Sequence, residues 1–534
     1  MNILKLFFKS VLITLSLSPI VCISQTFFIK SYGGPEPEIP GCLIQLPDSG
    51  FAIIGNTRSY GLGNQNLYLI RTNKNGDTLW TRASSNISGG QGNDILLTNE
   101  NDLIISGQTW GSSNLSQLMK FDLQGNLIYS KGYVPNLGGY FRAIKKTNDN
   151  NFILLGNCID SILNYQIKLM VIDSSGTALY VKTYGDIHSD MYTDFKTLNS
   201  GFIVTGAISC TFWPQLSYIF LMKLDNFGNV VWSRRYDNTP FCNIFPGSVV
   251  LTNDGGYALT GGFGINDDIL VMRTDSLGNL LWTKAYGGNS ADNASKIFLM
   301  PDNGFLIAGY SSSFNSAIKS QIYFIRTNAL GDTLWTKCIG DKQNTTNLRD
   351  VIQTIDGGYA ILAQSNGWNS TGTGDYDIVL LVLDSLLHSN CFDYNTSTIV
   401  TNVLLDDSSF IQPQYDYITQ TFNSLPIFTS GGTIAEWCTI PTEVFSGNDA
   451  NCDNFNLFPN PVQSELSINY KFSEECYFEL LNVIGIKKMT VILDSGSRTK
   501  RINLTDFDSG VYFYSVVDRK RNRIKAGKLI VQKK

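Results

Sequence analysis

A repeated unit constrains the fold of this chain more than any other feature of its sequence. Residues 253–288, NDGGYALTGGFGINDDILVMRTDSLGNLLWTKAYGG, have imperfect copies before and after them. The copies align on a glycine that ends a short apolar run: Gly55, Gly107, Gly156, Gly206, Gly261 and Gly309, with Ala363 in the last copy. They also align on an aromatic residue after a turn: Trp80, Tyr129, Tyr180, Trp232, Trp282 and Trp335. Successive aromatics lie 49 to 53 residues apart, and such a period indicates a solenoid, an array or a propeller.

The content of one period distinguishes between these architectures. Residues 257–260 and 269–273 are β-rich runs, and a glycine-containing turn at 275–279 leads into a third run at 280–284. Residues 295–300 form a fourth run. Four short antiparallel strands without an amphipathic helix between them are typical of one blade of a β-propeller. We therefore predict an all-β fold, in which the repeated aromatic lies on the outer strand and packs against the neighbouring blade.

The two ends of the repeated region are complementary half-units. Residues 27–34 match the end of a unit, whereas the last copy lacks its turn and aromatic strand, which residues 385–388 replace. If the N-terminal strand completes the last blade, the ring closes and leaves no open edge. Counting the inner strands gives seven. We predict a seven-bladed β-propeller over residues 25–390, closed by pairing of residues 27–30 with the strand at 378–383.

The N-terminus has the features of an export signal. Residues 1–24 carry Lys5 and Lys9 before an apolar run that is too short to span a bilayer. We expect a cleaved signal peptide over residues 1–24. Cys22 suggests a lipoprotein instead, but Val21 before it is not the small residue that a lipobox requires. The net charge is −5, and no later apolar run is long enough to cross a membrane, so we predict an exported protein with no integral membrane segment in the mature chain.

Two further segments follow the repeats. Residues 391–451 break the period and are rich in Thr, Ser, Asp and Asn, which predicts either a linker or a small β appendage. Residues 452–534 are more basic and contain several β-rich runs at short spacing. These runs predict a small C-terminal β-sandwich.

This terminal segment resembles the type A C-terminal sorting domain of the type IX secretion system of Bacteroidota. The matching residues are Pro459, Asn460 and Pro461, then Gly485, then Gly510, Val511 and Tyr512, and finally Lys528 in the last strand. The resemblance implies that the type IX secretion machinery is a partner and carries the chain, via the periplasm, to the cell surface or the medium. The basic residues from 519 to 534 would also suit nucleic acid, but we expect a solvated face and no nucleic-acid partner.

The repeat itself resembles that of secreted bacterial β-propeller proteins, written as DGGY, then G, then D-x-x-G-x-x-x-W, then GG. Its Gly-x-x-x-Trp portion is also similar to the tryptophan-docking motif of quinoprotein dehydrogenases. That similarity concerns packing, because the sequence does not reveal the calcium ligands and cofactor pocket that such enzymes need. We therefore expect no cofactor.

The sequence contains no recognisable catalytic set. Its two histidines, His188 and His388, lie in unrelated contexts, and HExxH, Walker and G-x-S-x-G motifs are absent. The cysteines lack the spacing of zinc sites; we expect mostly isolated thiols, with Cys210–Cys242 or Cys438–Cys452 as conceivable disulfides. The Asp and Asn residues of the repeated turns are expected to stabilise these turns rather than to bind calcium. We thus predict neither a metal site nor an enzyme.

Three tryptophans suggest a binding surface. Trp110, Trp213 and Trp368 each follow the second strand of a unit, so their loops and the Gly-Gly loops emerge on one face. Aromatic residues on a rim suit the recognition of sugars or proteins, although each tryptophan could instead anchor its own loop. We predict a secreted or cell-surface binding or structural module for a glycan or protein ligand. The alternative is a propeller enzyme, either polysaccharide-cleaving or quinoprotein-like.

Overall fold

The computed structural model describes residues 27–532 except 63–64, 85–88, 110–114, 135–138, 148, 160–163, 186–187, 210–216, 238–243, 265–266, 316, 369–374, 390, 411–413, 418–419, 424–427, 441–454, 460–461, 473, 483–486, 496–498 and 520–522. One compact unit spans Gln25–Pro441, and Thr442–Lys534 belong to a second. Throughout the described residues the regular elements are strands, which confirms the predicted all-β class. That part of the chain contains no helix long and apolar enough to cross a membrane.

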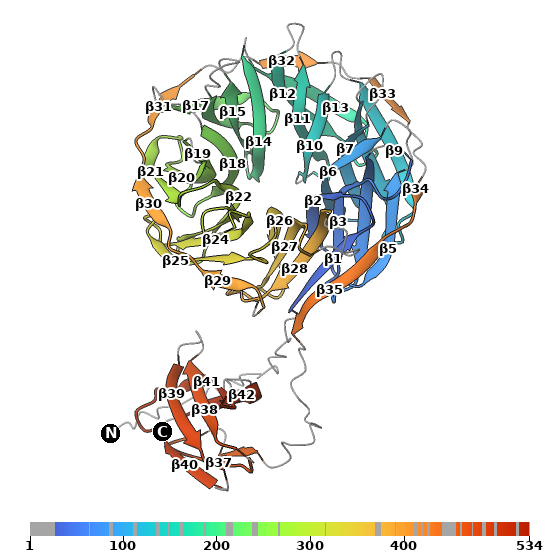
Figure 1. The fold of residues 1–534 in the computed structure, drawn as a ribbon. Helices are drawn as coiled ribbons and strands as arrows, with labels where there is room; N and C mark the ends of the chain where they lie inside the picture. The colour runs from blue at the N-terminus through green and yellow to red at the C-terminus, as the bar shows by residue number, and fades with distance from the viewer. Residues whose placement is uncertain are drawn as a thin grey trace, which may run out of the picture. The chain divides into compact units, whose positions relative to one another are not determined.

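The larger unit contains seven five-stranded antiparallel sheets, which are arranged in a ring (Figure 1). Each of the first six sheets takes its four inner strands from one continuous stretch of the chain. From the centre outwards, sheet 1 has β2 (Glu38–Gln45), β3 (Phe51–Thr57), β4 (Asn66–Thr72) and β5 (Thr78–Ser84); sheet 2 has β6 (Gly90–Leu97), β7 (Leu103–Thr109), β8 (Leu115–Phe121) and β9 (Leu127–Val134); sheet 3 has β10 (Gly139–Lys146), β11 (Phe152–Ile159), β12 (Tyr165–Ile172) and β13 (Ala178–Tyr184).

Sheets 4 to 6 repeat this order. Sheet 4 has β14 (Ser189–Leu198), β15 (Gly201–Ser209), β16 (Ser217–Leu224) and β17 (Val230–Asp237); sheet 5 has β18 (Ile244–Leu251), β19 (Tyr257–Phe263), β20 (Asp268–Thr274) and β21 (Leu280–Gly287); sheet 6 has β22 (Asp292–Leu299), β23 (Phe305–Ser311), β24 (Gln321–Thr327) and β25 (Thr333–Ile339).

Sheet 7 joins the two ends of the repeated region. Its inner strands are β26 (Thr346–Gln353), β27 (Tyr359–Ser365) and β28 (Asp377–Leu383), and its fourth strand is β1 (Phe27–Gly33). β1 runs antiparallel to β28, with Phe28 opposite Val382 and Lys30 opposite Leu380. The predicted pairing of residues 27–30 with residues 378–383 is therefore confirmed.

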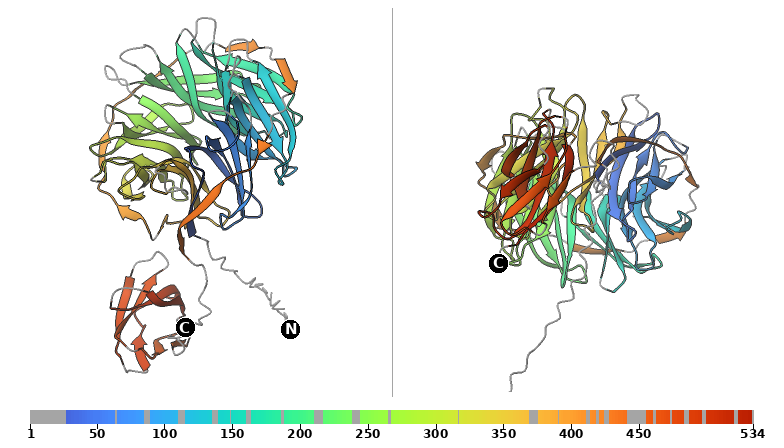
Figure 2. Two further views of the ribbon diagram at one scale, coloured as in Figure 1. Left: turned by 45° about the vertical axis from the view of Figure 1, so that its right-hand side comes forward. Right: turned by 90° about the horizontal axis from the view of Figure 1, so that it is seen from below.

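The fifth strand of every sheet comes from the segment that breaks the repeat period. These strands are β29 (Asp393–Asn395), β30 (Ile399–Asn402), β31 (Asp406–Ser409), β32 (Gln414–Tyr417), β33 (Gln420–Asn423), β34 (Phe428–Thr429) and β35 (Thr433–Ile440). They pair in turn with β25, β21, β17, β13, β9, β5 and β1. We call the segment from β29 to β35 the strap; it runs along the outer edge of the ring, against the order of the sheets (Figures 1 and 2).

The strap corrects our interpretation of residues 391–451. We expected a linker or a small appendage after residue 390, but the described residues up to Ile440 belong to the ring unit. The physical reason is that the fourth strand of each sheet would otherwise present unpaired backbone groups, and even a short polar segment forms a strand when it can pair with such an edge. The strap supplies that partner in all seven sheets.

The repeated aromatic residues hold neighbouring sheets together. Trp282 of sheet 5 packs on Gly331 in a turn of sheet 6, where a Cβ would lie 2.8 Å from the indole ring and φ is +77°, so only glycine fits without strain. Four residues after the tryptophan, the Tyr286 hydroxyl donates a hydrogen bond to the Gly331 carbonyl at 2.5 Å. Trp80 packs in the same way on Gly125 of sheet 2. The predicted packing against the neighbouring sheet is confirmed, although the strap makes the aromatic strand the fourth of five.

The smaller unit has two sheets around one core. A three-stranded sheet contains β36 (Asn456–Phe458), β37 (Glu465–Asn469) and β40 (Thr499–Asn503), and a four-stranded sheet contains β39 (Lys487–Leu493), β38 (Cys476–Asn482), β41 (Gly510–Val517) and β42 (Arg523–Val531). Their inward residues, among them Leu466, Phe478 and Leu529, are fully buried. Two sheets that share a core agree with the expected small β domain.

Candidate functional site

The innermost strand of every sheet carries a β-bulge, which inserts one extra residue and re-aims the side chains around it. The extra residues are Gly41, Asn93, Arg142, Thr193, Gly247, Ser295 and Arg349. Because the seven inner strands surround the centre of the ring (Figure 1), the bulges place one set of equivalent residues around that centre.

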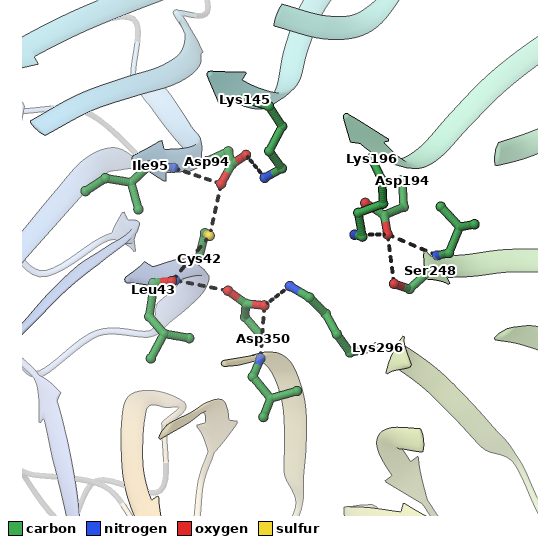
Figure 3. A network of polar contacts seen from close by, with 12 residues as sticks. Cys42, Leu43, Asp94, Ile95, Lys145, Asp194, Lys196, Ser248, Lys296 and Asp350 are labelled. Atoms are coloured by element: carbon green, nitrogen blue, oxygen red, sulfur yellow. Dashed lines mark hydrogen bonds and ion pairs between the residues drawn. The ribbon is translucent and has the colours of Figure 1, made fainter. Parts of the chain in front are cut away.

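The residues that follow the bulges form a polar network (Figure 3). Asp350 accepts hydrogen bonds from the backbone N–H of Leu43 at 3.1 Å and of Val351 at 2.9 Å. It also pairs with the ammonium group of Lys296. These partners lie in sheets 1, 7 and 6, so one carboxylate connects three sheets at the closure of the ring.

Two further carboxylates act in the same way. Asp94 of sheet 2 accepts the N–H of Ile144 in sheet 3 at 2.9 Å and pairs with Lys145 at 3.2 Å. Asp194 of sheet 4 accepts the N–H of Val249 in sheet 5 at 3.1 Å and pairs with Lys196 at 2.7 Å. Each carboxylate therefore joins its own sheet to the next one.

The charges of this network are mutually compensated. The negative charge of Asp94 raises the pKa of Lys145 against the opposing effect of burial. Burial would raise the pKa of Asp194, but Lys196 outweighs it and the pKa is lowered. Burial, with Asp350 and Asp94 nearby, raises the pKa of the Cys42 thiol well above its usual value. Each of the three carboxylates is thus paired with a lysine and the thiol stays protonated at neutral pH, so this network stabilises the inner wall.

Arg142 and Arg349 differ from these paired groups. Both are bulge residues of inner strands and both are exposed. Among the described residues neither forms an ion pair with a carboxylate. The protein atoms around Arg349 partly desolvate its guanidinium group, which lowers its pKa. Tyr310 opposes this decrease, and the positive charge of Arg142 adds to it. The guanidinium group of Arg142 lies over the ring of Tyr140, 5.7 Å from its centroid. Two interacting, unneutralised guanidinium groups beside tyrosines can bind an anion.

The predicted aromatic rim is not supported at the one position that can be described. Trp368 is 1% exposed and packs on Phe392, with ring centroids 5.1 Å apart, inside an apolar cluster. This packing agrees with the alternative interpretation, in which the tryptophan anchors its own loop. Trp110 and Trp213 lie outside the described residues.

The acidic residues of the repeated turns accept hydrogen bonds from the backbone of the same turn. Asp275 accepts hydrogen bonds from the N–H groups of Leu277 at 2.9 Å and Asn279 at 2.8 Å, which stabilises the turn. Where the structure is described, no group of three or more His, Cys, Asp or Glu side chains could hold a metal ion.

The cysteines and histidines show no common site. Cys42 and Cys338 are free thiols, and Cys391 is disulfide-bonded. The conceivable pairs Cys210–Cys242 and Cys438–Cys452 involve side chains outside the described set. His388 contacts the carboxylate of Asp384 at 3.0 Å, whereas His188 lies in the junction between sheets 3 and 4.

A buried acid at the junction of sheets 7 and 1 gives a pH prediction. Glu38 is fully buried and accepts hydrogen bonds from the Gly34 N–H at 3.1 Å and the Thr57 hydroxyl at 2.7 Å. Burial, opposed by these hydrogen bonds and assisted by Asp377, raises its pKa from 4.5 to about 7. The folded state therefore keeps this proton to a higher pH than the unfolded chain does. The stabilisation is present below pH 4.5 and is lost as the pH rises to about 7.

We expect the Glu38→Gln variant to lose this dependence. Relative to wild type, it should gain about 2 kcal/mol of stability between pH 5 and pH 8. Thermal unfolding of both proteins at the two pH values measures the difference, since titrating groups that do not interact with Glu38 cancel. Identical pH profiles would show that Glu38 does not titrate in this range.

The residues matched to a sorting signal lie in the smaller unit. Pro459 follows β36; Gly510, Val511 and Tyr512 begin β41; and Lys528 lies in β42 opposite Phe513. Asn460, Pro461 and Gly485 lie outside the described residues. The family model described as "Secretion system C-terminal sorting domain" matches residues 456–532. The chain is therefore a secreted or cell-surface protein with a type IX sorting tail.

Comparisons with whole proteins give only remote likenesses. The chain matches no curated protein. One similar solved structure is an ulvan lyase of polysaccharide lyase family PL25, bound to a GlcA-Rha3S saccharide; the identity is 10%, the TM-score is 0.44, and the match covers 66% of this chain and 96% of the lyase. Another is a protein of unknown function from Dyadobacter fermentans, with 12% identity, a TM-score of 0.34, and coverage of 66% and 97%. At these scores the matches say nothing about the ligand of this chain.

The lyase does correct one prediction. We expected no enzyme because the sequence lacks catalytic motifs, and the occurrence of a lyase among the similar structures contradicts that expectation. The physical reason is that a catalytic site built from several strands of a ring draws on residues distant in sequence and leaves no local motif. Missing motifs therefore do not exclude catalysis in this chain.

Proposed function

We propose that the seven sheets are the blades of a seven-bladed β-propeller in a Bacteroidota-type secreted protein. Three observations support this architecture: the cyclic order of the sheets, the β1–β28 pairing, and the hydrogen bond from Leu43 of sheet 1 to Asp350 of sheet 7. In this scheme residues 1–24 are the signal peptide, the propeller with its strap extends to about residue 441, and the remainder is the sorting domain.

The propeller, in this proposal, binds an acidic polysaccharide at the centre of the ring. The single observation that carries this assignment is the pair Arg142 and Arg349, which face the same central region from sheets 3 and 7 without acidic partners. All three carboxylates of the neighbouring network are occupied by lysines and backbone N–H groups, so none of them pairs with the arginines. A guanidinium group donates two parallel hydrogen bonds to one carboxylate, which suits a uronic acid.

Tyrosines beside the arginines suit the sugar rings. Tyr140 lies next to Arg142 in β10, and Tyr310 in β23 is close enough for Arg349 to affect its pKa. Aromatic faces bury the apolar side of a pyranose, while charged groups fix its carboxylate. This combination replaces the tryptophan rim that the sequence suggested.

Titration of the mature chain with polygalacturonate tests this function. We expect binding that weakens as salt is added, and no binding of the neutral polymer dextran. The double variant Arg142→Ala, Arg349→Ala should bind at least about tenfold more weakly, which corresponds to about 1.4 kcal/mol. Lys74→Ala is the control, because it removes an exposed positive charge from the turn between β4 and β5.

Isothermal titration calorimetry measures the affinities, and size-exclusion chromatography of the polymer detects shortening. If the wild-type protein shortened the polymer and the double variant did not, catalysis would be assigned to the same site. Equal affinity of wild type and the double variant would contradict the proposed site.

A further inference from the structure

Two acidic side chains meet at the junction between sheets 5 and 6. Asp268 begins β20, the third strand of sheet 5, and Asp292 begins β22, the innermost strand of sheet 6. Both carboxylates crowd over Gly287. A Cβ on this glycine would lie 2.2 Å from Oδ1 of Asp268 and 2.7 Å from Oδ2 of Asp292. The glycine thus leaves the space in which the two acids approach each other.

One oxygen of each carboxylate lacks a hydrogen-bond donor. Asp292 is fully buried, and its Oδ2 accepts hydrogen bonds from the Gly288 N–H and the Ser313 hydroxyl, both at 2.8 Å. Its Oδ1 is buried without a hydrogen-bond partner, and the same is true of Oδ1 of Asp268. Buried charged oxygens without a donor are strongly destabilising unless a positive group compensates them.

The equivalent junction between sheets 6 and 7 shows what is missing. There Gln321 occupies the position of Asp268, and Thr346 occupies that of Asp292. The Gln321 amide nitrogen donates to the carbonyls of Ser320 at 2.8 Å, Asp341 at 3.2 Å and Asn344 at 2.6 Å. The amide oxygen of Gln321, above Gly340, is also without a partner. The two junctions therefore differ in that one carries acidic side chains and the other carries an amide that donates hydrogen bonds.

The junction between sheets 3 and 4 follows the same rule. Gln166 stands in the position of Asp268, beside Asp190, and its amide donates to the carbonyl of His188 at 3.2 Å. At this junction an amide donor therefore stands beside the acid Asp190. At the junction of sheets 5 and 6 an acid replaces the donor, and two negative charges face each other.

We propose that Asp268 and Asp292 bind a calcium ion. Ca²⁺ is a hard cation that takes carboxylate and carbonyl oxygens as ligands. The carbonyl of Asp267 lies beside the pair, because it accepts the Asp292 N–H at 3.1 Å. A site with two carboxylates suits the weak affinities of extracellular modules, of the order of 10⁻⁴ to 10⁻³ M, which fits a protein that leaves the cell.

The pKa directions agree with this assignment. Burial, with Asp292 and Asp267, raises the pKa of Asp268, and burial raises the pKa of Asp292. This repulsion is what a bound cation relieves. The junction of sheets 7 and 1 also brings two acids together, Asp377 and Glu38. There, however, Glu38 has a donor for each of its oxygens. One calcium ion per chain is therefore expected.

Thermal unfolding of the mature chain after EDTA treatment and dialysis tests the site. We expect 2 mM CaCl₂ to raise Tm by about 2 to 4 °C, and MgCl₂ to raise it less, because Mg²⁺ demands stricter geometry. Calorimetric titration with CaCl₂ should give one site. The variant Asp268→Asn should lose both the Tm shift and the heat of calcium binding. If that variant does not fold, Asp268→Gln replaces it in the experiment, because sheets 3 and 6 have a glutamine at this position.

Asp332→Asn is the matched control, since it removes an exposed carboxylate from a turn and should keep the calcium response. Equal Tm values in EDTA and CaCl₂ would overturn the proposal. A calcium response that persists in both Asp268 variants would also overturn it, because the ion would then bind elsewhere. A Tm in EDTA that rises on acidification in wild type but not in Asp268→Asn, without a calcium effect, would assign a shared proton to the pair instead.

Discussion

Removal of residues 442–534 is expected to leave the ring unit in the periplasm. The family match covers residues 456–532, and the ring unit ends at Pro441, so the truncation removes the sorting tail without cutting a strand of the ring. Cell fractionation and immunoblotting in a host with the type IX system would measure surface and periplasmic fractions. We expect the surface fraction to fall to background.

The reciprocal fusion protein is the control for this experiment. Residues 442–534 fused to an unrelated periplasmic reporter should carry that reporter to the surface. A truncated propeller that still reached the surface would show that the tail is not its sorting signal, and a reporter that stayed in the periplasm would show that the tail is not sufficient.

The substitution Asp350→Ala is expected to lower the stability of the ring by about 3 to 4 kcal/mol. The change leaves the ammonium group of Lys296 without its partner and the Leu43 N–H without an acceptor. Urea denaturation of the mature chain, followed by tryptophan fluorescence, measures the shift of the midpoint.

Two variants make this result interpretable. Asp332→Ala breaks an exposed ion pair with Lys284 and should change the stability far less. Adding Lys296→Met to Asp350→Ala should restore part of the loss, because it removes the unpaired charge. If Asp350→Ala were no more destabilising than Asp332→Ala, the inner network would not hold the ring closed.

The repeat made much of the ring predictable, but not the strap. Strands within a copy have alternating or continuous apolar patterns, and the half-unit at residues 27–34 identified the partner of β28. The strap strands lack such a pattern: residues 406–409 read DDSS and residues 414–417 read QYDY. Their conformation comes from the open edges with which they pair, and a single sequence does not contain that information.

The candidate binding residues were missed for a different reason. Arg142 and Arg349 project from bulges, and a bulge depends on the register between two strands rather than on a local motif. The aspartates Asp94, Asp194 and Asp350, which recur at one position of the inner strands, were a usable signal. We had instead followed aromatic residues in loops, which selected Trp368, a core residue.

The strap also determines when the ring can be finished. Its last strand, β35, pairs with β1 so that Phe27 lies opposite Ile440. The first strand of the ring unit therefore waits for its last strand, and this ladder has one of the longest sequence separations that the ring unit allows. Such non-local pairing is slow and follows the local hairpins. Without residues up to 440 the chain can close the ring through β1 and β28, but it cannot complete the outermost layer of strands.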